Sequence, residues 1–163
     1  MNRTMRKMTA AVEWMLLILL VLYLAPMVIP FSDMHHFSRD INQAKKEGSF
    51  YPGSPDRQTY YDSKLRVDGV IYREGQLSVY MTGTGLGPYS KLPSNLQIET
   101  DSGAPLQYSG GGSSHNVLRT EGYYVYKNVP DQIRSVTIRN REPAYGQSFA
   151  FHIPLEGSGR HGE

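Results

Sequence analysis

The sequence predicts a mainly β protein: an N-terminal transmembrane helix continues into an amphipathic helix, and a small antiparallel β-sandwich follows. Three patterns support this fold class. Residues 14–31 form an eighteen-residue run without charge, residues 34–44 repeat apolar side chains at helical spacing, and from Leu65 onward apolar and polar residues alternate in short runs. A chain of 163 residues has room for one ordinary domain with such an appendage, but not for a large enzyme scaffold.

The charge distribution separates the two parts. Before Ser32 there are three basic residues and one acid, whereas 14 basic and 14 acidic residues balance from Ser32 onward. A neutral body has no charge excess for a phosphate backbone, so we expect no nucleic-acid partner. The absence of cysteine excludes disulfides, thiolate zinc sites and cysteine nucleophiles.

The apolar run is long enough to cross a bilayer. About 20 helical residues span the hydrocarbon core, and we predict a transmembrane helix over residues 9–31 after a cytoplasmic leader at 1–8. Arg3, Arg6 and Lys7 precede the run, so the positive-inside rule places the N-terminus in the cytoplasm and the remainder outside. A cleaved signal peptide is the alternative, but no A-x-A-like site follows the apolar core.

Glu13 interrupts the apolar stretch near its start. A carboxylate at the centre of a membrane helix costs about 2.5 to 3.5 kcal/mol on insertion scales, and less near an interface. Two interpretations remain open: Glu13 reaches the cytoplasmic headgroups, or it pairs with a cation on a neighbouring helix.

The string from Thr9 to Trp14, TAAVEW, followed by an apolar run, resembles the start of type IV pilin-like subunits, especially the TadE-like pseudopilins of tight-adherence systems. The resemblance covers residues 6–48 and implies a processing point between Met8 and Thr9, although Met8 stands where prepilin substrates usually have glycine. It also implies that Glu13 and Trp14 set the register of packed helices and that Pro30 kinks the helix.

The segment after the membrane run predicts a second helix over residues 32–48. Met34, Phe37, Ile41 and Ala44 share one face, and Gly48 is a natural C-terminal stop. Adjacent histidines at 35 and 36 point in different directions, so we interpret them as surface residues and not as metal ligands. Residues 49–64 are rich in turn formers and predict an extended linker or wrap.

Seven short strands with no helical segment between them predict the exported sandwich over residues 65–156, before a disordered tail at 157–163. Glycine-rich stretches at 82–88 and 109–114 are expected to be loops. The predicted core consists of the inward residues of these strands: Leu65, Val67, Leu77, Val79, Leu96, Ile98, Val136, Ile138, Phe149, Phe151 and Ile153.

The strings YKNVP at 126–130 and SVTI at 135–138 resemble immunoglobulin-like exported domains of bacterial single-pass regulators, such as anti-sigma-type proteins. This resemblance implies an immunoglobulin-like sandwich and a role in binding or signalling. Twelve tyrosines could supply a contact surface, but strand propensity explains them as well.

No pattern predicts catalysis, a cofactor or a metal site. Ser113, Ser114 and His115 are contiguous, unlike a catalytic triad, and His115, His152 and His161 lack metal-ligand spacing. We therefore predict a non-enzymatic pilin-like subunit that meets the membrane, other pilin-like subunits or assembly-platform proteins, and further copies of itself. The alternative is a membrane-tethered extracytoplasmic binding or signalling module.

Overall fold

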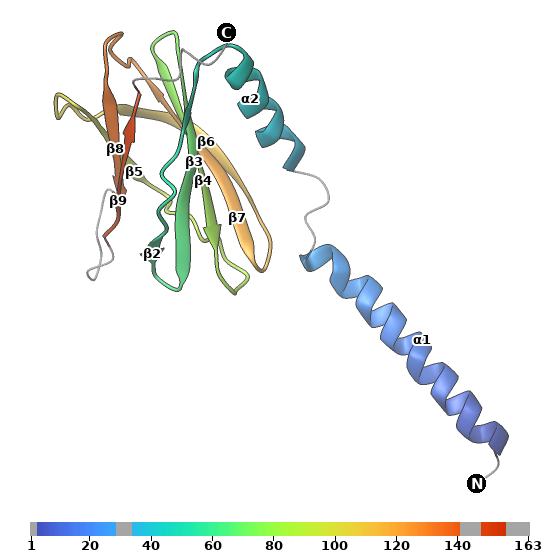
Figure 1. The fold of residues 1–163 in the computed structure, drawn as a ribbon. Coiled ribbons are helices and arrows are strands. Elements are labelled where there is room, and N and C mark those ends of the chain that lie inside the picture. Colours follow the sequence, from blue (N-terminus) through green and yellow to red (C-terminus); the bar gives the residue numbers. More distant parts are fainter. Residues whose placement is uncertain (1–2, 29–33, 141–147, 156–163) are drawn as a thin grey trace.

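A computed structural model describes residues 3–28, 34–140 and 148–155 (Figure 1). It contains two helices and nine strands. The helices are α1 (Arg3–Val28) and α2 (Met34–Lys46), and the strands are β1 (Phe50–Pro52), β2 (Gln58–Tyr60), β3 (Ser63–Arg73), β4 (Gln76–Thr84), β5 (Leu96–Thr100), β6 (Gln107–His115), β7 (Arg119–Lys127), β8 (Ser135–Asn140) and β9 (Ala150–Pro154). The mainly β class with an N-terminal apolar helix is confirmed.

The strands form two antiparallel sheets that share one core. The larger sheet has the order β1-β3-β4-β7-β6, with β2 pairing the other half of β3, and the smaller sheet has the order β5-β8-β9. One cluster of buried side chains joins both sheets, from Leu65 and Val79 of the larger to Ile98 and Phe151 of the smaller. All eleven residues predicted for the core are buried.

The hairpin between β3 and β4 closes through a two-residue turn. Arg73 pairs with Gln76, and the intervening Glu74 and Gly75 have φ angles of 47° and 72°. Positive φ at both positions defines a type I′ turn, whose twist matches that of the flanking strands. Glycine at 75 adopts this conformation without steric cost.

One predicted loop is part of a strand in the structure. The glycine-rich segment 109–114, expected to be a loop, lies within β6, because ladder hydrogen bonds to β7 fix it.

The turn after β5 forms locally through a bridge between Glu99 and Pro105, but β5 and β6 then enter different sheets. Alternation within each segment does not encode which sheet a strand joins.

A β-bulge in β3 reverses the alternation expected from the sequence. The register shifts between Val67 and Gly69, so Val70 lies in the main core, whereas Ile71 joins a separate cluster with Ala44 of α2. The extra residue of a bulge changes which face the following side chains occupy. The bulge therefore gives the outer face of the larger sheet an apolar site for the helix.

Helix α2 ends as predicted. Gly48, with φ 69°, donates its N–H to the carbonyl of Lys45, and Ser49 donates to the carbonyl of Ala44. These two bonds form a Schellman motif, which stops the helix and turns the chain directly into β1. The segment 49–64 extends along the sheet and contributes β1 and β2.

Helix α1 is one uninterrupted helix, and Lys7–Ala25 is long and apolar enough to cross a membrane. Pro30, the boundary between the two predicted helices and the tail at 157–163 lie outside the described residues.

Candidate functional site

The surface of α1 is the first candidate site. Its large apolar side chains from Met8 to Leu24 are exposed on every side of the helix, and Trp14 is 67% exposed. A helix that is apolar all round requires a membrane or other helices to cover it. Glu13 lies among these residues, exposed, and it has no ion pair within the described part of the chain.

The other residues predicted for anchoring and processing fall at the start of α1. Met8 and Thr9 are helical and exposed, as is Lys7. Arg3 and Arg6 belong to the same helix, but their side chains lie outside the described set, as does Pro30 as a whole. The structure thus brings Lys7, Met8, Thr9, Glu13 and Trp14 onto two turns of one helix.

The second candidate site lies where α2 covers part of the larger sheet. Ala44 is fully buried and Ile41 partly buried, and they pack with Ile71 and Tyr80 on the outer face of the sheet. At the end of α2, the Nζ of Lys45 lies 5.0 Å from the centroid of the Phe50 ring.

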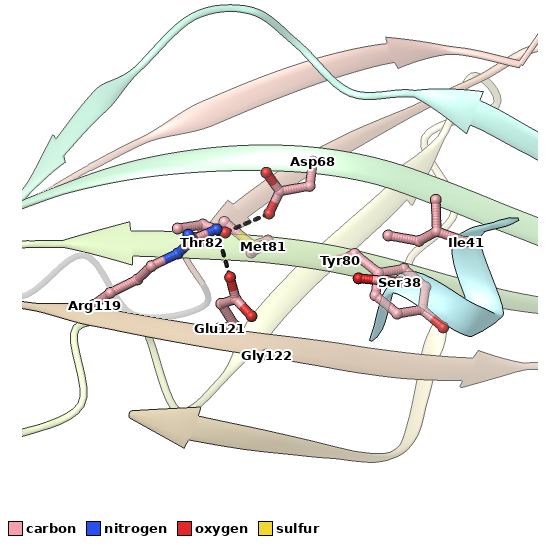
Figure 2. Close-up of a pocket in the computed structure, with 9 residues that line it drawn as sticks. All are labelled: Ser38, Ile41, Asp68, Tyr80, Met81, Thr82, Arg119, Glu121 and Gly122. Atoms are coloured by element: carbon pink, nitrogen blue, oxygen red, sulfur yellow. Dashed lines mark hydrogen bonds and ion pairs between the residues drawn. The ribbon is translucent and has the colours of Figure 1, made fainter. Parts of the chain in front are cut away.

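Beyond the helix, the same face continues as an uncovered groove with a cavity of about 280 Å³ (Figure 2). Tyr80 and Ile41 lie at the α2 end, whereas Asp68 and Arg119 lie at the other. Tyr80 stacks on Tyr123 with ring centroids 6.1 Å apart. Burial, with smaller effects from Asp40 and Tyr123, raises the pKa of Tyr80 to about 12, so its hydroxyl is neutral at physiological pH.

Two acids in this groove already have partners. Asp68 accepts from both Nε and Nη2 of Arg66, at 2.8 and 2.5 Å, and from the hydroxyl of Thr82 at 2.6 Å. Glu121 forms an ion pair with Arg119 (Figure 2). The acids therefore hold two arginine side chains in place along the face of the sheet.

A smaller cavity of about 150 Å³ adjoins the groove and shares Thr82 and Arg119 with it. Four basic side chains and two hydroxyls line it: Arg57, Lys64, Arg66, Arg119, Thr82 and Thr84. This cluster was not predicted from the sequence. Arg66 alternates with apolar residues in the predicted strand and was a visible signal, but Lys64 fell in the predicted linker. Arg57 and Arg119 reach the cavity only through long-range pairing.

The serines and histidines considered in the C-terminal half of the sequence lie on different strands where the structure describes them, with His152 in β9. Ser113, Ser114 and His115 lie along β6, and residues 82–84 of the glycine-rich 82–88 segment belong to β4. Among residues 3–28, 34–140 and 148–155, no group of three or more histidines and acids is placed to hold a metal ion. His161 lies outside these ranges.

Searches of protein-family models, curated proteins and solved structures found no match to this chain.

Proposed function

We propose that this chain is a non-enzymatic, pilin-like assembly subunit anchored by α1, with the β-sandwich displayed on the extracytoplasmic side. The basic residues before the apolar run support this orientation. The head would extend into a filament or secretion apparatus of the tight-adherence type. Its partners would be other pilin-like subunits, an assembly platform, or further copies of this chain.

The exposed carboxylate of Glu13 within an otherwise apolar helix surface is the observation that carries this proposal. Removing a carboxylate from water is costly unless it meets a cation, and packed apolar helices exclude water. A neighbouring subunit can supply that cation from a free amine at Thr9 or from Arg6 or Lys7. Such a pair fixes the register between helices, as buried polar groups do in coiled coils.

We expect Glu13→Ala and Glu13→Gln to abolish co-purification of two differently tagged copies from membranes, while the head stays folded. Glu13→Gln removes the negative charge but keeps the size of the side chain, so it separates the effect of charge from that of shape. Asp101→Asn, which removes an exposed carboxylate in the turn after β5, is the matched control and should leave assembly unchanged. Normal co-purification of both Glu13 variants would refute the proposal.

A tethered binding or signalling module is the second candidate, and the strand order favours it. When β1 and β2 are left aside and β3 is taken as strand A, the strand orders of the two sheets are β3-β4-β7-β6 and β5-β8-β9. This is the ABED and CFG order of constant-type immunoglobulin domains, which supports an immunoglobulin-like sandwich of the kind found in many binding modules.

Replacing residues 9–31 with an unrelated transmembrane segment distinguishes the two candidates. A tether tolerates this exchange, because only anchoring matters. An assembly helix does not, because its surface and Glu13 are lost. Retained cellular function after the exchange would favour the binding module.

A further inference from the structure

The basic cavity on the outer face of the larger sheet is built by strand register. Lys64 pairs with Thr84 and Arg66 with Thr82 across β3 and β4, and Thr84 pairs with Arg119 of β7. Residues two apart on a strand share a face, so these side chains gather on one surface. Arg57, just before β2, completes the lining.

The cavity carries an excess of about two positive charges. Asp68 and Glu121 pair with Arg66 and Arg119, respectively. Lys64 donates to the hydroxyl of Thr59 at 2.7 Å, and within the described residues no carboxylate pairs with Lys64 or Arg57. Grouped cations repel one another, so a bound dianion would stabilise this arrangement.

Arg119 links the cavity to the neighbouring groove, because it lines both. Its Nε is buried and has no hydrogen-bond acceptor among the described residues. Buried donors normally have a partner, and a guanidinium is well suited to oxyanions because it can donate two parallel hydrogen bonds. Thr82 and Thr84 line the same place, but their hydroxyl protons are already donated to Asp68 and to the carbonyl of Lys64, so the cationic side chains are the donors for a ligand.

The size and charge of the cavity indicate which anion fits. At about 150 Å³ it is smaller than the roughly 300 Å³ or more of pockets that enclose drug-sized ligands, so it suits one ionic group. Two uncompensated positive charges match a phosphate monoester, which carries about −1.5 to −2 near neutral pH, better than a carboxylate.

The adjoining groove can hold the remainder of such a ligand. Tyr80 offers an aromatic ring, and the oxygens of Asp68 and Glu121 can accept hydrogen bonds from hydroxyl groups. We infer that the basic cavity binds the phosphate of a phosphate monoester whose hydroxyl-bearing body lies along the groove. A soluble polyol or sugar phosphate and a phospholipid headgroup share this chemistry.

Titration calorimetry on the full chain in nanodiscs of neutral lipid tests the inference, with glycerol 3-phosphate, inorganic phosphate and glycerol as probes. We expect saturable binding of glycerol 3-phosphate, weaker binding of inorganic phosphate and none of glycerol. Lys64→Gln and Arg57→Gln should each weaken binding about tenfold, because each removes one charged contact. Lys127→Gln, an exposed lysine at the far end of β7, is the matched control.

Absence of saturable binding, or equal affinity in Lys64→Gln, Arg57→Gln and the wild type, would overturn the site. Equal affinity for glycerol 3-phosphate and inorganic phosphate would overturn the role of the groove. Nanodiscs containing phosphatidate distinguish the two sources: a lipid ligand competes and lowers the affinity for glycerol 3-phosphate, whereas a soluble ligand leaves it unchanged. The assay does not require assembly through α1, so its outcome is independent of that of the Glu13 variants.

Discussion

Lys91 is a lysine buried without a carboxylate partner. It is 5% exposed, and its Nζ donates to the carbonyls of Gly87, Tyr89 and Asn116 at 2.9 to 3.1 Å. Burial lowers its pKa, but three carbonyl acceptors satisfy all three ammonium protons. The side chain thereby connects the segment after β4 with the turn between β6 and β7.

Lys91→Met should destabilise the protein by about 1–3 kcal/mol, because the three carbonyls lose their shared donor while the volume is nearly kept. Urea denaturation measures the free energy of unfolding, and amide exchange should accelerate around residues 87–91 and at 116. Lys127→Met, at an exposed position, should change neither. A variant as stable as the wild type would show that water replaces the ammonium at no cost.

Three buried tyrosines predict a loss of stability at high pH. Burial raises the pKa of Tyr80 to about 12 and raises the pKa values of Tyr124 and Tyr126, each well above the usual 10. The folded state therefore holds these protons more tightly than the unfolded state. The resulting stabilisation is complete below about pH 10 and is lost as the pH rises towards 12.

Urea midpoints measured from pH 9 to 12 test this, with tyrosinate absorbance following ionisation. Tyr80→Phe should reduce the slope of stability against pH, because one linked proton is removed. Tyr89→Phe, at a position that is 81% exposed, should leave the slope unchanged. Identical slopes in all three proteins would contradict the assignment to Tyr80.

At the level of elements, α2 is held to the sheet by a small apolar contact. Ala44→Asp places a carboxylate in the fully buried position of that contact, so we expect α2 to detach while the two-sheet core persists. Limited proteolysis should then cut within residues 34–48, and the melting temperature should fall by several degrees. Asn42→Asp, on the exposed side of the helix, should resist cleavage like the wild type.

Local patterns predicted the elements well because each depends on nearby residues. Apart from the glycine-rich part of β6, the strands from Leu65 to Ile153 follow from alternation, and the end of α2 follows from Gly48. The bulge between Val67 and Gly69 was not predictable, because it depends on pairing with β4 and on the packing of Ile71 against α2. The strand at 109–114 was missed because glycine and serine have low strand propensity, which the ladder to β7 overrides.

At the level of the whole molecule, hydropathy alone predicted the long apolar helix α1, but it could not predict the basic cavity. Its lining comes from four segments that only the order of strands brings together. The positions of Tyr124 and Tyr126 in the core also depend on long-range strand pairing and could not be predicted from the sequence. Both side chains are buried in the core, where the hydroxyl of Tyr124 donates to the carbonyl of Pro93, before β5, and that of Tyr126 donates to the carbonyl of Leu96, the first residue of β5.

The order in which the chain enters the sandwich also determines how it would respond to mechanical force. Tension applied through α1 would reach α2 first, then the three-residue β1, and only afterwards the long ladder between β3 and β4. Unfolding of residues 34–57 would release an extended segment about 80 Å long before the force acts on the core strands. The connection between α1 and the sandwich would therefore lengthen under load while the two-sheet core stays intact, and it would shorten again when α2 and β1 refold.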